Sequence, residues 1–219
     1  MRLAALVAGV TETGITPVFS GGTSLSKGYG LIQRFSEDLD FKLNLPDEGI
    51  PRSRRRAYRQ RVIEAIRQEG TWRVPEDGIQ KGNESRYFAC RIDYESAFEP
   101  TPALRTHVKL EISFEAPTLA TETRPVQSFV VQAQGIRPEV AGIACVSPVE
   151  TAADKLSALT WRVLTRERGS ERDDPTLIRH LHDLAALERR ARNEAAFPGL
   201  LRTRLDQDAR RGAPSGEFR

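Results

Sequence analysis

The sequence predicts an α/β (α+β) fold in which a mixed β-sheet is followed by a C-terminal helical part. Two features of the chain lead to this prediction. Segments with strand-like composition occur between residues 17 and 132, separated by Gly, Pro and Glu clusters and by one long basic helix. From Pro148 onward, Leu and Ala recur at helical spacing. We therefore expect a sheet-bearing core over residues 1–147, a helical part over residues 148–203 and a disordered, polar tail over residues 204–219.

Length and composition restrict the class of protein. The 219 residues are enough for one domain with a small helical appendage, and the 39% hydrophobic fraction allows a buried core. No apolar run approaches the ~20 residues that a membrane span needs, so we expect no membrane partner. Cys90 and Cys145 lie far apart and form no Cys-x-x-Cys pair, which favours a reducing, cytoplasmic location. Residues 2–10 are expected to form a short helix rather than a signal peptide, because no convincing cleavage site lies after them.

The first motif has the pattern of an anion-binding turn. An apolar strand, Pro17–Phe19, leads into Gly21 and Gly22, which carry no side chain that would keep a phosphate away from the backbone. Thr23 and Ser24 then open a helix, whose first backbone N–H groups are unpaired and attract anions. A Gly-Gly turn alone is most often ordinary loop punctuation, so its weight depends on the next motif along the chain.

Two acidic residues lie on the next expected strand. Asp38 and Asp40 alternate with Leu39 and Phe41, so both carboxylates fall on one face of the strand and both apolar side chains on the other. Asp-x-Asp alone is usually a solvated strand face. Beside a phosphate site, however, two carboxylates are what a pair of divalent metal ions on a nucleoside triphosphate requires. The order of the two motifs therefore indicates a metal-dependent nucleotide site.

The two motifs together carry a specific resemblance. Phe-Ser-Gly-Gly-Thr-Ser-Leu-Ser-Lys-Gly-Tyr at residues 19–29, with Arg-Phe-Ser-Glu-Asp-Leu-Asp-Phe at residues 34–41, closely resembles the AbiEii-type nucleotidyltransferase toxins of type IV abortive-infection toxin–antitoxin systems. The resemblance implies a nucleotidyltransferase fold that transfers a nucleoside monophosphate from a nucleoside triphosphate to an acceptor hydroxyl, with Mg²⁺ (or Mn²⁺) as cofactor. It also implies an RNA acceptor, with tRNA favoured, and an antitoxin that need not form a stable complex.

The resemblance assigns roles to residues of both motifs and of a later strand. The implied nucleotide-binding residues are Gly21, Gly22, Thr23, Ser24 and Lys27. The implied metal ligands, which are also catalytic, are Asp38, Asp40 and a third acid. The strands expected after the long helix are Thr71–Val74, Arg86–Tyr94, His107–Phe114 and Gln127–Gln132. Glu111 alternates with apolar neighbours within the third of these, which favours it as the third acid, and Asp93 on the preceding strand is the competing candidate.

The expected C-terminal helices carry two further catalytic candidates. In the AbiEii pattern the first helix has a Lys and the second an Asp, and Lys155 and Asp183 match these positions. The resemblance implies that the helical part closes the site, that Lys155 offsets charge on the phosphates and that Asp183 positions Lys155 or the acceptor. The alternative interpretation of both residues is i,i+4 pairing or capping within their own helices.

Arginine dominates the basic residues, because only five of the 33 Lys and Arg residues are Lys. The expected helix Arg52–Gln68 begins with a dense block of Arg between Arg52 and Arg61. One interpretation of this block is a solvated helix face, and the other is an electrostatic footprint for an RNA backbone.

Two other classes of function are alternatives to an enzyme. A nucleotide-binding module without turnover would bind nucleoside triphosphates even after loss of Glu111. A non-catalytic RNA-binding component would use the basic helix and be indifferent to Asp40. The presence of Ser24, Asp38 and Asp40 argues against both alternatives, since neither needs them.

Overall fold

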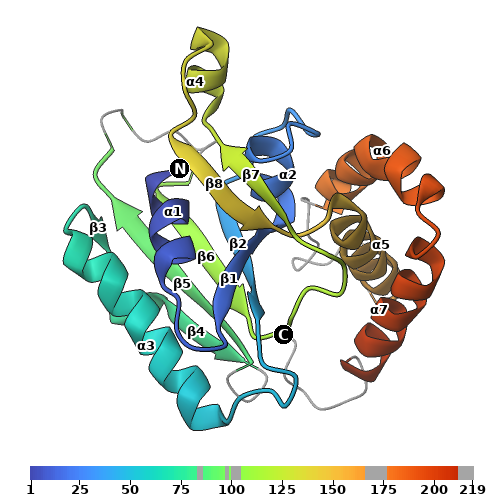
Figure 1. The fold of residues 1–219 in the computed structure, drawn as a ribbon, viewed down its shortest axis with the longest axis horizontal. Helices are drawn as coiled ribbons and strands as arrows, with labels where there is room; N and C mark the ends of the chain where they lie inside the picture. The colour runs from blue at the N-terminus through green and yellow to red at the C-terminus, as the bar shows by residue number, and fades with distance from the viewer. Residues whose placement is uncertain (83–85, 97–98, 100–104, 166–176, 212–219) are drawn as a thin grey trace. The chain divides into compact units, whose positions relative to one another are not determined.

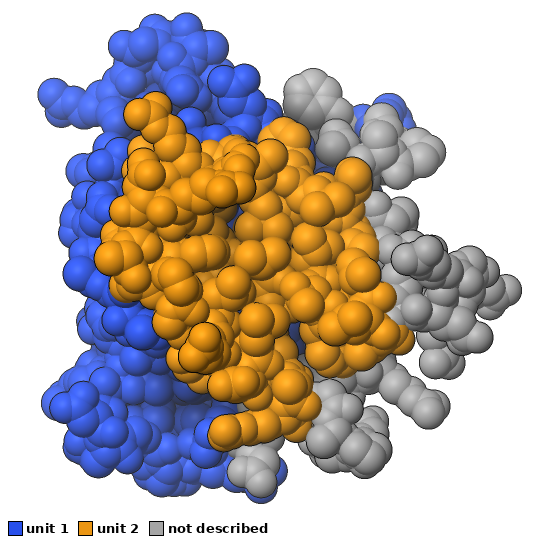
Figure 2. All heavy atoms as spheres, turned by 90° about the vertical axis from the view of Figure 1, so that its right-hand side faces the viewer, with its two compact units in different colours: residues 1–146 blue, residues 147–219 orange. Residues whose placement is uncertain are grey.

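The computed structural model describes residues 1–82, 86–96, 99, 105–165 and 177–211 (Figure 1). The chain divides into two compact units, Met1–Val146 and Ser147–Arg219, which Figure 2 draws in different colours. The first unit contains the β-sheet, and the second contains helices.

The sheet of the first unit is mixed and has eight strands within the described residues. The strands are β1 (Thr16–Ser20), β2 (Asp38–Asn44), β3 (Trp72–Arg73), β4 (Ile79–Gly82), β5 (Tyr87–Tyr94), β6 (His107–Ser113), β7 (Glu122–Val126) and β8 (Val140–Cys145). They follow the order β3-β5-β6-β2-β1-β8-β7, and β4 also pairs with β5. The pairs β2–β6 and β1–β8 are parallel, whereas the other neighbours are antiparallel. A mixed sheet followed by helices confirms the predicted fold class.

Helices α1 (Arg2–Gly9) and α3 (Arg52–Glu69) pack on one face of this sheet (Figure 1). The apolar stripe of α3 recurs every four residues and is fully buried: Tyr58, Val62 and Ile66. Leu39 and Phe41 of β2 belong to the same core. Because successive side chains of a strand point to opposite faces, the acids that alternate with Leu39 and Phe41 lie on the other face of the sheet.

The sequence predicted some of the strands and missed others. The expected strands at Thr71–Val74, Arg86–Tyr94 and His107–Phe114 correspond to β3, β5 and β6. Strands β4, β7 and β8 were not expected. Between β1 and β2 lies the short helix α2 (Gly21–Lys27), and a 3₁₀ turn, η1 (Glu76–Gly78), precedes β4.

The prediction of a strand over Gln127–Gln132 is wrong, because most of this segment lies in helix α4 (Phe129–Gln134). The Ser128 side chain caps the helix by accepting a hydrogen bond from the Val131 backbone N–H at 3.2 Å. Gly135 then ends the helix with φ +63°. These two local signals outweigh the strand preference of the β-branched residues between them.

The second unit contains three helices within the part of the chain that is described: α5 (Pro148–Thr165), α6 (Leu177–Asn193) and α7 (Phe197–Arg211). Helix α5 packs against both α6 and α7. The expectation of a disordered tail over residues 204–219 is wrong for residues 204–211, which form the last turns of α7, and residues 212–219 lie outside the described residues. Buried Arg204 binds Glu150 of α5 at 3.0 Å, which ties this helix to its neighbour. Every described helix is too short or too polar to cross a bilayer.

Candidate functional site

At the turn between β1 and α2, the backbone of Gly21 packs against the carboxylate of Asp40. Ser20, the last residue of β1, is the antiparallel partner of Asp40 on β2. Gly21 is the next residue, with φ +70°, in the left-handed region that favours glycine. A Cβ at residue 21 would lie only 1.9 Å from Asp40 Oδ2. Both the backbone conformation and the adjacent carboxylate therefore require glycine at residue 21.

Gly22 and Thr23, the next two residues, pack against the segment that leads into β2. A Cβ on Gly22 would lie 2.9 Å from Arg34 Nη2 and 3.1 Å from Ser36 Oγ. The buried Thr23 hydroxyl donates to the backbone carbonyl of Asp38 and lies 2.9 Å from Ser36 Oγ. The two motifs that the sequence singled out therefore form one structural unit.

The other two nucleotide-binding candidates have different neighbours. Ser24 is buried, and its hydroxyl hydrogen-bonds with the Cys145 thiol, which opposes the rise in the thiol pKa that burial causes. Lys27 Nζ lies 2.8 Å from the centroid of the Phe129 ring on α4. Desolvation lowers the pKa of Lys27 to about 8, with Glu139 opposing the shift. In this structure, Lys27 therefore contacts α4 rather than the acids of β2.

Asp40 and Glu111 lie side by side on neighbouring strands. The parallel register of β2 and β6 aligns Asp40 with Glu111. Adjacent strands are ~4.8 Å apart, so aligned side chains on one face adjoin each other. Asp93, the competing third acid, is aligned instead with His107 at the start of β6. The register thus brings Glu111, and not Asp93, to Asp40.

Three residues that the sequence did not select contact these acids: Tyr87, Arg105 and Lys109. Lys109 Nζ lies 2.6 Å from Glu111 Oε1, and the Tyr87 hydroxyl donates to the same oxygen. Burial would raise the pKa of Glu111, but hydrogen bonds from Lys109 and Tyr87 outweigh it and hold that pKa below its ordinary value. Arg105 Nη1 binds Asp38 Oδ1 at 2.9 Å. Strand alternation would have revealed Lys109, whereas Tyr87 and Arg105 depend on the strand pairing and on a loop.

The donor chemistry of this face partly fits a divalent cation. Carboxylate oxygens are the ligands that Mg²⁺ and Mn²⁺ prefer. Nevertheless, the described part of the chain holds no group of three or more His, Cys, Asp or Glu side chains placed to bind a metal ion. Asp40 and Glu111 adjoin, whereas Asp38 is bound to Arg105. A cation at the first pair would share the Glu111 carboxylate with Lys109 and Tyr87, and Asp38 could join it only after leaving Arg105.

Lys155 and Asp183 form an ion pair between α5 and α6. Lys155 Nζ lies 2.9 Å from Asp183 Oδ2, and the two side chains are 13% and 0% exposed. His182 Nδ1 lies 3.5 Å from the other carboxylate oxygen. Because the pair joins two helices, i,i+4 pairing within one helix does not explain it.

The chain is similar to known proteins over nearly its whole length. Residues 5–219 match the family model described as the nucleotidyl transferase AbiEii toxin of type IV toxin–antitoxin systems. Among solved structures, MenT4, a nucleotidyltransferase toxin from Mycobacterium tuberculosis H37Rv, is 21% identical, with 93% of this chain and 79% of that chain covered and a TM-score of 0.49. The antibiotic-resistance factor ANT(2'')-Ia is 14% identical, with 96% of this chain and 91% of that chain covered and a TM-score of 0.47. No curated protein sequence matches the chain.

Proposed function

Because the chain belongs to the AbiEii family of nucleotidyltransferase toxins of type IV toxin–antitoxin systems, we propose that it transfers a nucleoside monophosphate from a nucleoside triphosphate to an RNA hydroxyl. tRNA is the favoured acceptor, and a cognate antitoxin, which need not bind the toxin stably, relieves the resulting growth arrest. One observation carries the proposal: Asp40 adjoins both Glu111 and the side-chain-free turn at Gly21. Carboxylates beside a glycine turn suit the phosphates of a nucleotide together with their cation.

In this proposal, Asp38, Asp40 and Glu111 bind Mg²⁺ or Mn²⁺. Such a cation, when bound, would supply Lewis-acid chemistry that lowers the pKa of the acceptor hydroxyl and offsets the charge of the triphosphate. Glu111 supplies an ionised carboxylate, since its two hydrogen-bond donors keep its pKa low. Arg105 must release Asp38 before that carboxylate can take part.

The phosphates are proposed to lie at the turn of Gly21 and Gly22, which have no side chains of their own and against which Asp40 and Arg34 pack. Thr23 and Ser24 hold this backbone in place rather than contact the phosphates, because both are buried and their hydroxyls are engaged. Lys27 would have to leave the Phe129 ring to bind the nucleotide, and at a pKa of about 8 it is mostly protonated at neutral pH.

A labelling assay tests the proposed reaction. The protein is incubated with Mg²⁺, total RNA and each nucleoside triphosphate in turn, labelled at the α-phosphate. We expect one or more of the nucleotides to label an RNA species. Nucleotide binding without any labelled product would favour the binding module instead. Salt-sensitive RNA binding without labelling, unaffected by loss of Asp40, would favour the non-catalytic RNA-binding component.

We also propose that Lys155 and Asp183 act in the reaction, with Asp183 positioning the Lys155 ammonium so that it offsets phosphate charge. Asp183→Asn is expected to lower both transfer activity and stability, because it leaves the largely buried ammonium without its counter-charge. Breaking such a pair costs ~3 kcal/mol of unfolding free energy. Chemical denaturation measures the stability, and the labelling assay, run well below the unfolding transition, measures the activity.

The matched control is Glu188→Gln on the same helix, which removes an exposed pair with Arg192 at 2.8 Å. Exposed pairs contribute ~0–1 kcal/mol, so this variant should keep both stability and activity. A destabilised but fully active Asp183→Asn protein would assign the pair to packing alone. If Asp183→Asn were as stable as Glu188→Gln, the pair would not contribute the stability expected of a buried ion pair.

A further inference from the structure

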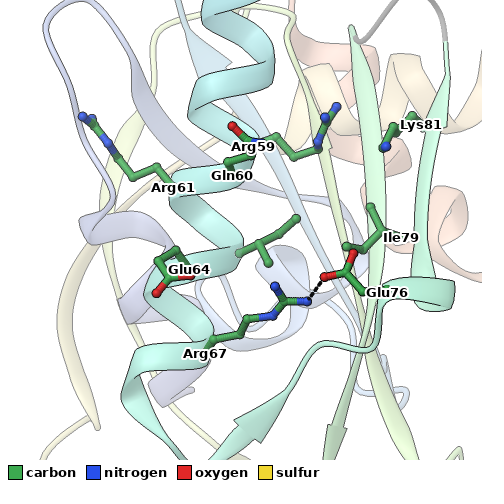
Figure 3. A pocket seen from close by; sticks show the side chains of 9 residues that line it. Arg59, Gln60, Arg61, Glu64, Arg67, Glu76, Ile79 and Lys81 are labelled. Carbon is green, nitrogen blue, oxygen red and sulfur yellow. Dashed lines mark hydrogen bonds and ion pairs between the residues drawn. The ribbon is translucent and has the colours of Figure 1, made fainter.

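A second candidate site lies on the face of the sheet that α3 covers. A hollow of about 540 Å³ opens between α3 and β4 (Figure 3). Its charged lining comprises four cations and two acids: Arg59, Arg61, Arg67, Lys81, Glu64 and Glu76. Lys81 is aligned with Phe88 of β5, which is part of the core under α3. Aligned residues share a face, so the hollow and the carboxylates of β2 and β6 lie on opposite faces of the sheet.

Half of this positive charge is neutralised within the protein. The neutralised cations are Arg67, which binds Glu76 at 2.7 Å (Figure 3), and Arg61, which binds Glu12 at 2.8 Å. The remaining acid, Glu64, is exposed and accepts a hydrogen bond from Gln68 at 2.9 Å. Gln68 is neutral, so Glu64 keeps its negative charge, and the other two cations, Arg59 and Lys81, still leave the hollow with net positive charge.

Arg59 is the unusual member of the lining. It is only 7% exposed, yet within the described residues it has no hydrogen bond or ion pair. Burial, and then repulsion from Arg56, lower the pKa of its guanidinium. Its guanidinium borders the hollow and has no counter-charge in the described part of the chain, so an anion in the hollow would pair with it. In Figure 3 the side chain extends from α3 toward the strand that carries Lys81.

We propose that this hollow binds a phosphate group of an RNA backbone, with Arg59 as the buried contact and Lys81 at the rim. A guanidinium can bind a phosphate through two parallel hydrogen bonds, and the exposed Lys81 ammonium adds a compact charge. That the bound polyanion is RNA rests on the proposed function.

The surroundings of the hollow favour a polymer over a free nucleotide. Arg52 and Arg56 are exposed and precede Arg59 along α3 at spacings of four and three residues. Residues at these spacings share one side of a helix, so a row of cations leads into the hollow. A chain of phosphates would engage the whole row, whereas a single nucleotide would engage only its end.

Amine acetylation read by mass spectrometry reports whether a ligand covers Lys81. We expect unfractionated tRNA to protect Lys81 from acetylation at low salt and to lose this effect at high salt. Pyrophosphate serves as the free polyphosphate. Protection by pyrophosphate but not by tRNA would overturn the RNA assignment, and protection by neither would overturn the phosphate site itself.

Two variants test the same site through affinity and stability. Lys81→Gln should weaken tRNA binding about tenfold in fluorescence anisotropy. The control Arg137→Gln removes an exposed charge outside the hollow and should have little effect. Arg59→Met should weaken tRNA binding, because it removes the guanidinium that would contact the phosphate, and chemical denaturation measures its stability. Equal affinities of Lys81→Gln and Arg137→Gln, or a folded Arg59→Met protein with normal affinity, would overturn the proposal.

These experiments test the hollow and the proposed reaction independently, because tRNA binding is measured without nucleotide. RNA labelling by the wild-type protein with unprotected Lys81 would overturn the hollow and leave the proposed function standing. Protection of Lys81 by tRNA, with no RNA labelled by any nucleotide, would support the hollow and count against the proposed reaction.

Discussion

Asp40→Asn is expected to abolish nucleotidyl transfer while leaving the protein folded. Asp40 adjoins Glu111 on one side and the Gly21 turn on the other, where the proposed cation and phosphates meet. Asn keeps the size of the side chain, so the turn retains its shape, but it removes the negative charge. Metal-ion charge stabilisation contributes several kcal/mol, which corresponds to at least ~10³-fold in rate. The labelling assay measures the rate, and circular dichroism checks the fold.

Two other acids provide the comparison. Glu111→Gln should share the defect, because Glu111 is the neighbour of Asp40 across the β2–β6 pair. Asp93→Asn should remain active, since Asp93 is aligned with His107 and lies 3.2 Å from Arg91 in an ion pair. A folded Asp40→Asn protein that labels RNA at the normal rate would rule out the proposed site.

Local pattern was enough to predict the faces of the strands but not their neighbours. The two-residue period of a strand put Asp38 and Asp40 on one face and Leu39 and Phe41 on the other, and the buried core agrees. That β6 lies parallel beside β2 depends on the order of the whole sheet, which no local pattern contains. The sequence could therefore name Glu111 as a candidate but could not separate it from Asp93 by position.

Burial of charge was the other property that the sequence did not reveal. The Arg block of α3 allowed a solvated face or an RNA footprint, and nothing in its spacing marked Arg59 as the buried member. In α7, the polar composition of residues 204–219 indicated disorder, although Arg204 is held by Glu150 from another helix. Both outcomes depend on tertiary contacts, and composition averages over them.

Gly21→Ala is expected to reduce transfer by about a hundredfold or more. The sequence suggested that glycine lets a phosphate approach, but the structure gives a more direct reason for glycine at residue 21. The new methyl group would lie 1.9 Å from Asp40 Oδ2, so either the turn or the carboxylate must move. A displacement of ~1 Å in a reacting group can cost ~10²-fold in rate. The left-handed conformation adds ~1–2 kcal/mol of strain, which chemical denaturation measures.

Gly49→Ala separates the strain from the displacement. Gly49 has φ +71°, nearly the same as Gly21, but a Cβ there would have no atom within 4 Å. Both variants should therefore lose similar free energy of unfolding from the backbone strain, while only Gly21→Ala loses transfer activity. If the two variants were equally active, contact between residue 21 and Asp40 would not matter to the reaction. If Gly49→Ala were equally impaired, general destabilisation would explain the defect, and the turn would have no special part in binding the nucleotide.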